Sequence, residues 1–235
     1  MHMQKSLRKA YSESLDQVQS IFKTKLQETR DALATALDTE KVETFDFKSF
    51  NKQMQEFENT MEHDIFKIIS LQAPISKDLR LLLSDLKSSN DLRRIAKTIS
   101  RISKVSKKYF IDPAEEIVVD PTVLESFNEM GKSLLNMFDQ VLEIYSSDSE
   151  KLTHDRAIEF QKQFSQEDDN VDSLFKETLG QLVKNIRGEI DSKKQAKLTT
   201  ETLLMIRHME RIGDHLCNIA ERILYVETGN HFHIS

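Results

Sequence analysis

The sequence predicts an all-α protein made of two tandem antiparallel three-helix bundles. Only five glycines and three prolines occur among 235 residues, so long segments run without a strong helix breaker. These segments are rich in Leu, Lys, Glu, Gln and Ala, which favour helix and leave little room for strands. The chain also repeats itself at one constant offset, which indicates an internal duplication.

Six helices are expected, with boundaries good to about four residues. They lie near residues 4–38, 44–72, 76–109, 121–148, 153–188 and 194–228. Pro74 and the Asp112-Pro113 pair interrupt the helical pattern. Asp120-Pro121 predicts an N-cap followed by proline at the first helical position. Gly188 and Gly229 stand where left-handed C-terminal caps are expected.

The duplication appears when the second half is laid on the first. Arg211-Ile212 then falls on Arg94-Ile95, and other pairs follow at the same offset. They are Leu81 with Leu198, Leu86 with Leu203, Ile102 with Ile219, Lys67 with Lys184, and Ile69 with Ile186. We therefore predict a first repeat over residues 1–112 and a second over 113–235, joined by residues 110–120.

Composition narrows the class of protein. The net charge of −6 and the absence of a segment dominated by Lys and Arg argue against binding to nucleic acid or anionic membranes. The longest apolar runs, such as residues 203–206, are far shorter than the roughly 20 residues of a spanning helix, and we expect no signal peptide before the first helix. We expect a cytoplasmic protein. The single cysteine, Cys217, excludes an internal disulfide and is expected in the core.

One stripe of side chains suggests metal binding. Glu210, Asp214 and Asn218 are four residues apart, so they lie one above another on a helix. Like charges at this spacing weaken a helix by a few tenths of a kcal/mol unless a cation or a basic neighbour offsets them. Oxygen donors suit iron(III), manganese, magnesium or calcium, whereas zinc usually takes His or Cys as well. The alternative is a solvated acidic face.

The first repeat reverses the sign of this stripe. The offset pairs Glu210 with Arg93, Asp214 with Lys97 and Asn218 with Arg101. On the preceding helix it pairs Asp168 and Asp172 with Asn51 and Gln55. Clustered anionic oxygens therefore occur only in the second repeat, and we expect any metal there.

Two carboxylates of the first repeat are expected to neutralise its basic stripe. Glu58 and Glu62 should pair with Arg93 and Lys97 across antiparallel helices, at about 0–1 kcal/mol for each solvent-facing pair.

The last helix has an apolar face formed by Met205, Ile212, Leu216, Ile219 and Ile223. The acidic stripe should point away from this face. His208 and His215 project away from the stripe, so we expect packing or surface roles for them. Gly213 in mid-helix suggests that a neighbouring helix or an ion approaches closely. His231 and His233 lie where chains usually fray.

The segment from Glu210 to His215, followed by residues 218–221 and Thr228-Gly229, resembles the signature helix of the PhoU family of phosphate-uptake regulators. Residues 74–80 resemble that family's entry to its third helix. The resemblance implies two side-by-side three-helix bundles that bind clusters of iron or other metal ions. Residue by residue, the ligands retained are Asp168, Asp172, Glu210, Asp214 and Asn218.

By the same resemblance, the cofactor would be a divalent or trivalent metal ion, iron first, with manganese, magnesium, calcium or zinc as alternatives. The function implied is negative regulation of phosphate uptake by a homodimer. Its partners would be the phosphate ABC transporter and the phosphate-sensing histidine kinase, which would hold it at the inner face of the membrane.

Two other functions are alternatives to phosphate regulation. Di-iron oxidases use Glu-x-x-His motifs directed into a bundle, and no histidine here follows a glutamate at that spacing. We therefore predict no enzymatic activity. The remaining alternative is a metal-free helical scaffold or adaptor.

Overall fold

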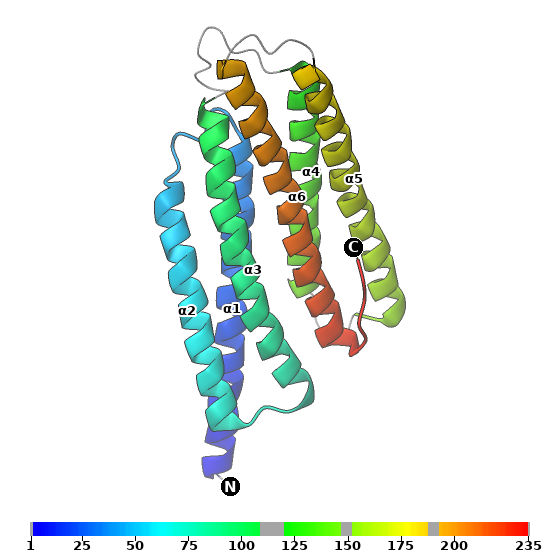
Figure 1. Ribbon diagram of the computed structural model, residues 1–235. Coiled ribbons are helices and arrows are strands. Elements are labelled where there is room, and N and C mark those ends of the chain that lie inside the picture. The colour runs from blue at the N-terminus through cyan, green and yellow to red at the C-terminus, as the bar shows by residue number, and fades with distance from the viewer. Residues whose placement is uncertain (1, 109–119, 147–151, 188–192, 235) are drawn as a thin grey trace.

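Six long helices form the computed structural model, which describes residues 2–108, 120–146, 152–187 and 193–234 (Figure 1). They are α1 (His2–Leu37), α2 (Phe47–Gln72), α3 (Ser76–Ser106), α4 (Pro121–Ser146), α5 (His154–Arg187) and α6 (Lys193–Thr228). No strand occurs within these ranges. The all-α prediction is confirmed, and the predicted helix ends that fall on described residues lie within three residues of the observed ones. The ends predicted at residues 109, 148 and 188 lie outside the described residues.

Aspartate side chains cap the N-terminal ends of two helices. The Asp46 carboxylate caps α2 by accepting hydrogen bonds from the backbone N–H groups of Lys48 and Ser49, both at 3.0 Å. Asp120 accepts from the N–H of Thr122 at 3.0 Å, which confirms the cap predicted before α4.

The predicted cap after α6 is also confirmed. Gly229 has φ +73°, and its N–H donates to the Tyr225 carbonyl at 2.9 Å. Gly188 and Asp112-Pro113 lie outside the described residues.

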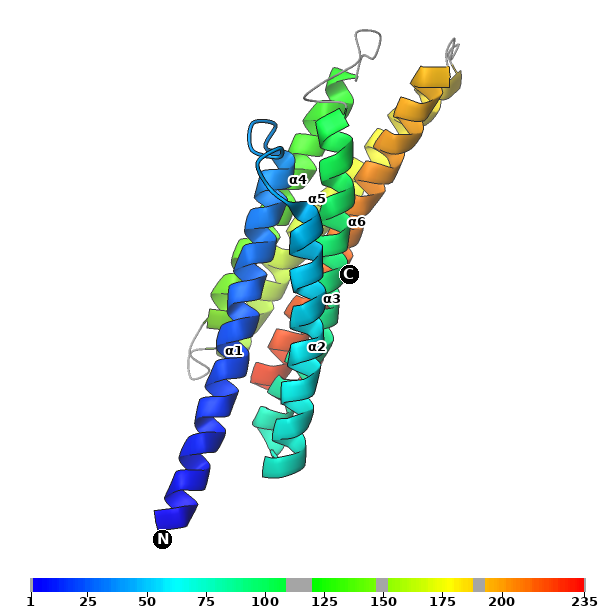
Figure 2. The ribbon, with the colours of Figure 1, turned by 90° about the vertical axis from the view of Figure 1, so that its left-hand side faces the viewer.

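The helices group into two antiparallel bundles, α1–α3 and α4–α6, which meet along α3–α6 and α1–α4. Figures 1 and 2 together show α3 and α6 side by side on one face and α1 and α4 on the opposite face. Helices α2 and α5 form the two edges, and the N-terminal end of α1 extends past the other helices (Figure 2). The predicted boundary at residues 112 and 113 lies outside the described residues and stays a prediction.

A single apolar core runs through both bundles. Its largest fully buried side chains include Phe22 of α1, Phe127 and Phe138 of α4, and Phe164 of α5. The five residues predicted to form the apolar face of α6 are all buried. Helix α6 packs against α3, α4 and α5 at once, so it also buries residues beyond that face. These are Met209, Cys217, Ala220 and Leu224.

A buried polar cluster joins α3 to α6. The Asp91 carboxylate lies 2.9 Å from Nδ1 of His215 and 2.5 Å from Arg222, whose guanidinium also donates to the Ser88 hydroxyl at 3.3 Å. Burial acts to raise the pKa of Asp91, but hydrogen bonds from His215 and Arg222 and their charges hold it below the ordinary value. The cluster fixes the position of one bundle on the other.

Candidate metal centre

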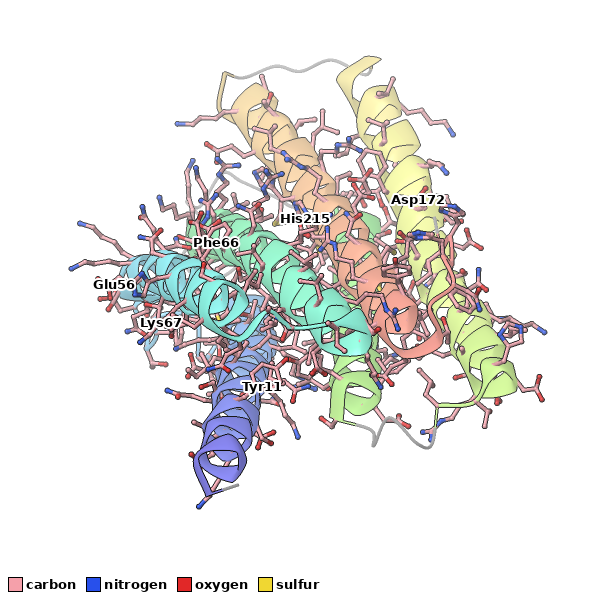
Figure 3. All side chains as sticks on the ribbon, turned by 90° about the horizontal axis from the view of Figure 1, so that it is seen from below. Tyr11, Glu56, Phe66, Lys67, Asp172 and His215 are labelled. Atoms are coloured by element: carbon pink, nitrogen blue, oxygen red, sulfur yellow. The ribbon has the colours of Figure 1, made fainter. Side chains whose placement is uncertain are left out.

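The structure brings the predicted carboxylates together from two adjacent helices. Asp168 and Asp172 lie on α5, and Glu210 and Asp214 lie on α6 (Figure 3 labels Asp172). Burial and then the charge of Asp172 raise the pKa of Asp214, although Arg207 opposes the shift. Burial and the charges of Asp214 and Asp172 likewise raise the pKa of Glu210. The carboxylates therefore repel one another across the α5–α6 contact.

Asp168 of α5 lies close to α6 at Gly213. A Cβ added at Gly213 would lie 3.2 Å from Asp168 Oδ1, so the glycine leaves room for the carboxylate. The expectation that a neighbouring helix approaches Gly213 closely is confirmed. Burial and the charges of Asp172 and Asp214 raise the pKa of Asp168, an effect that hydrogen bonding by the Cys217 thiol partly offsets.

The expectation that the whole stripe points into solvent is wrong for Glu210. Its side chain is only 11% exposed, and its Oε2 is buried without a hydrogen-bond partner. The cause is the packing of α5 against α6, which a single helical period does not reveal. Asp214 and Asn218 are exposed, as predicted. The Asn218 amide donates to the backbone carbonyl of Asp214 at 3.0 Å.

Two cations already contact these carboxylates. Arg207 forms an ion pair with Glu210, and Lys176 lies 3.1 Å from Asp172. Both are basic neighbours of the kind expected to offset repulsion between like charges. Among the described residues, no three His, Cys, Asp or Glu side chains are gathered closely enough to hold a metal ion as they stand.

The residues nevertheless fit a hard cation in their chemistry. The donors are all oxygen, and one buried oxygen of Glu210 lacks a hydrogen-bond partner. Burial and the charges of neighbouring carboxylates raise the pKa values of Asp168, Glu210 and Asp214. A bound cation would favour the ionised carboxylates. Arg207 and Lys176, which are largely exposed, would have to move aside.

At the equivalent position of the first bundle, a carboxylate of α2 neutralises a basic residue of α3. Arg93 pairs with Glu58 as predicted, and the Asn90 amide donates to the same carboxylate. The predicted pair of Glu62 with Lys97 is wrong, since these two described residues form no ion pair. Helices α2 and α3 are antiparallel, so the Glu58–Arg93 contact places Glu62 and Lys97 about one turn away in opposite directions.

The histidines of α6 have packing roles. His215 is buried against Asp91 of α3, away from the acidic stripe. His208 is partly buried, and its Nδ1 has no hydrogen-bond partner. Burial and the charges of Arg101 and Arg211 lower the pKa of His208.

Residues 231–234 pack against α5 and α6, whereas the sequence suggested a frayed end. Phe232 and Ile234 are 9% and 7% exposed. The Ile234 N–H donates to Glu221 at 2.9 Å, and the carbonyl of His233 accepts from Gln161 at 2.7 Å. The alternation of apolar residues with His231 and His233 was the sequence signal for this packing.

Comparison with known proteins identifies the family. The PhoU domain model matches residues 127–223, a range that contains all five candidate ligands. The phosphate-specific transport system accessory protein PhoU homolog 1 of Thermotoga maritima is 31% identical over 176 residues, which cover 75% of this chain and 69% of that protein. The chain belongs to the PhoU family.

Other PhoU relatives agree with this assignment. The PhoU homolog of Clostridium acetobutylicum is 29% identical over 177 residues, which cover 75% of this chain and 73% of that protein. The crystal structure of the phosphate transport system regulatory protein PhoU from Streptococcus pneumoniae superposes with a TM-score of 0.73 and 21% identity, over 94% of this chain and 99% of that one. PhoU from Pseudomonas aeruginosa gives a TM-score of 0.69, with 21% identity over 96% and 99% of the two chains. Both crystal structures have the fold described here.

Proposed function

We propose that this PhoU-family chain regulates inorganic phosphate uptake negatively by contact with other proteins. The observation that carries the proposal is its similarity to phosphate-specific transport system accessory proteins over three quarters of its length. The contacts would be with the phosphate ABC transporter and the phosphate-sensing histidine kinase, at the inner face of the membrane. None of the described helices has a stretch long and apolar enough to span a bilayer.

The same proposal includes a metal ion on the second bundle. Asp168, Asp172, Glu210, Asp214 and Asn218 would hold it, with iron the first candidate because the donors are hard oxygens. The bound ion would supply positive charge and brace α5 against α6. The first bundle offers Arg93, Lys97 and Arg101 at the equivalent positions, which exclude a cation.

A metal-free adaptor is the second candidate. It is favoured by the ion pairs of Arg207 with Glu210 and of Lys176 with Asp172, which already neutralise two of the candidate ligands. Elemental analysis of protein purified without a His-tag separates the two, because the metal proposal requires stoichiometric metal. Anomalous scattering from a metal beside Arg93 and Lys97 would contradict its placement.

Deletion of the gene tests the regulatory role. Phosphate uptake and expression of phosphate-starvation genes should both rise in phosphate-replete cells, and the wild-type gene should restore them. Complementation with Asp214→Asn then measures how far the role depends on the acidic stripe. Unchanged uptake and expression after deletion would contradict the proposed function.

A further inference from the structure

A cavity opens between the two bundles at the end of the molecule where α3 begins and where α4 and α6 end. These helix ends and the first half of α1 lie together in the lower half of Figure 1. All four helices line the cavity, whose volume is about 550 Å³. This volume is within the range of small-molecule sites and far larger than a bare ion needs. Because two of the lining helices belong to each bundle, a molecule held here would contact both bundles at once.

Two polar side chains of α3 line this cavity and are buried with unused hydrogen-bonding capacity. Asp85 is 1% exposed, and the only hydrogen bond that its carboxyl group makes to a described residue comes from the Tyr145 hydroxyl at 3.0 Å. Ser84 is 7% exposed, and its hydroxyl makes no hydrogen bond within the described part of the chain. Buried polar groups are normally hydrogen-bonded, so these two groups can bind a molecule that enters the cavity.

Carboxyl groups outnumber ammonium groups along the walls of the cavity. The described lining residues with such groups are Asp16, Asp78, Asp85, Glu227, Lys23 and Lys77. Lys77 is already 2.6 Å from Glu227. An anionic molecule would meet the excess of negative charge, so the cavity favours a cation. The cation is not a metal ion, because nowhere in the described ranges do three His, Cys, Asp or Glu side chains gather closely enough to hold one.

The carboxyl groups of α3 are spaced like the charges of a linear polyamine. Asp78 and Asp85 are seven residues apart, so they lie on one side of the helix, about 10 Å apart along its axis. Leu81 lies between them and lines the cavity, together with Leu15 of α1 and Ile223 of α6. A chain of methylene groups with an ammonium group at each end matches this order of charged, apolar and charged side chains. Spermidine is such a molecule, and its extended chain spans a comparable distance.

We propose that this cavity binds a linear aliphatic polyamine, with one terminal ammonium group at Asp85 and the other at Asp78. The methylene chain lies against Leu81, and the Ser84 hydroxyl accepts a hydrogen bond from a further N–H group of the ligand. The bound molecule contacts α1 and α3 of the first bundle and α4 and α6 of the second. Binding therefore stabilises the contact between the bundles.

Binding is coupled to the release of a proton from Asp85. Burial raises the pKa of Asp85 to about 8, although the hydrogen bond from Tyr145 opposes the shift, so the carboxyl group holds a proton at pH 7. Burial and then the charge of Asp85 raise the pKa of Tyr145, which stays a hydrogen-bond donor. An ammonium group beside Asp85 favours the ionised carboxylate, so the proton leaves when the polyamine binds. The other charged groups that line the cavity are Asp16 and Lys23 of α1, Lys77 and Asp78 of α3, and Glu227 of α6.

Isothermal titration calorimetry of the whole protein with spermidine, at pH 7 and about 0.15 M salt, tests the proposal. Buffers of different ionisation enthalpy give the number of protons released, which should approach one for each spermidine bound. Asp85→Asn should bind spermidine on the order of tenfold more weakly and release no proton, because it has no carboxyl group to ionise. Asp78→Asn should also bind more weakly, but it should still release the proton from Asp85.

Matched variants and ligands separate the cavity from the rest of the acidic surface. Asp31→Asn makes the same change at an exposed position of α1 outside the cavity, so it should bind spermidine like the wild type. Heptylamine has one ammonium group and should bind more weakly than spermidine. Pimelate carries carboxylates at both ends of a similar chain and should not bind. Asparagine at position 78 or 85 can still accept the tyrosine hydrogen bond made there, and circular dichroism checks that both variants are folded.

Three results would overturn the proposal. One is a wild type that does not bind spermidine at millimolar concentration. Another is equal binding by the wild type and Asp85→Asn, which would assign the heat to the acidic surface and not to the cavity. The third is binding of pimelate or of uncharged heptanediol as tight as that of spermidine, which would show that charge does not select the ligand.

Discussion

Helices α3 and α6 occupy equivalent places in the two bundles, but they differ in what they expose. Ile95 and Ile212 are buried alike, as are Ile102 and Ile219. At the exposed positions, Lys97 of α3 stands where α6 has Asp214. Packing holds these buried apolar positions to similar residues in both bundles, whereas exposed positions are free to reverse sign. The buried residues that the two repeats share therefore specify the fold. The exposed residues that differ between them give each bundle its own surface charge.

The largest expected effect concerns the polar cluster between the bundles. The offset pairs Asp91 with His208, but Asp91 contacts His215 and Arg222, whereas Nδ1 of His208 has no hydrogen-bond partner. Asp91→Asn should lower the free energy of unfolding by about 3–5 kcal/mol, because it leaves Arg222 without its counter-charge in a largely buried site. His208→Asn should cost about 1 kcal/mol or less. Urea unfolding of both variants measures this difference. Equal losses of unfolding free energy in the two variants would show that the contacts of Asp91 add no stability beyond those of His208.

A second difference between the bundles, at Asp85, predicts that the stability of the protein depends on pH. Asp85 is buried where the second bundle has Thr202, and it accepts a hydrogen bond from the Tyr145 hydroxyl at 3.0 Å. Burial raises the pKa of Asp85 from the model-compound value of 3.8 to about 8, although the hydrogen bond from Tyr145 opposes the shift. The folded protein therefore keeps a proton that the unfolded chain has released.

The free energy of unfolding should then fall as pH rises from about 4 to about 8, and level off above that range. Between pH 5 and pH 8 the loss should be on the order of 3 kcal/mol. Asp85→Asn cannot ionise and still accepts from Tyr145, so it should remove most of this slope and be the more stable protein at pH 8. Guanidinium unfolding across this range checks the result, and parallel pH profiles for the two proteins would contradict it.

The smallest structural contrast is Ala96 against Gly213, which the offset pairs. Ala96→Gly should cost about 1 kcal/mol, since α3 has no group that needs the space. Gly213→Ala gains helix propensity but places a Cβ 3.2 Å from Asp168 Oδ1, so we expect a net change of less than about 1 kcal/mol and weaker metal binding. Unfolding and metal titration measure the two effects. Unchanged metal affinity in Gly213→Ala would argue that Asp168 is not a ligand.

The fold could be predicted from the sequence because its signals are local. Proline, glycine and capping residues end the helices, and the apolar period of α6 identifies Ile212 and Leu216 as core residues. The constant offset between the two halves predicted two equivalent three-helix units. These signals act within one helix or within one repeat, so no knowledge of tertiary contacts was needed.

The site could be predicted only in part. The helical period placed Asp214 and Asn218 correctly on an exposed stripe. The burial of Glu210 depends on how α5 lies on α6, which no single helix encodes. Among the exposed basic side chains of α3, the offset between the repeats predicted Lys97 and Arg101. It did not predict Lys87, Arg94 or Lys104, which counting at 100° per residue would have placed on the same side of the helix.

Thermal unfolding with and without chelator tests most directly whether the acidic stripe of the second bundle holds a cation. A metal bound only by the native state adds stability that chelation removes, so chelator should lower the Tm of the wild type by several degrees. It should have little effect on Asp214→Asn, which lacks one anionic ligand, and its full effect on the matched first-bundle variant Lys97→Asn. The contrary result is a wild type indifferent to chelator, with Asp214→Asn melting at the same or a higher temperature because repulsion with Glu210 is relieved.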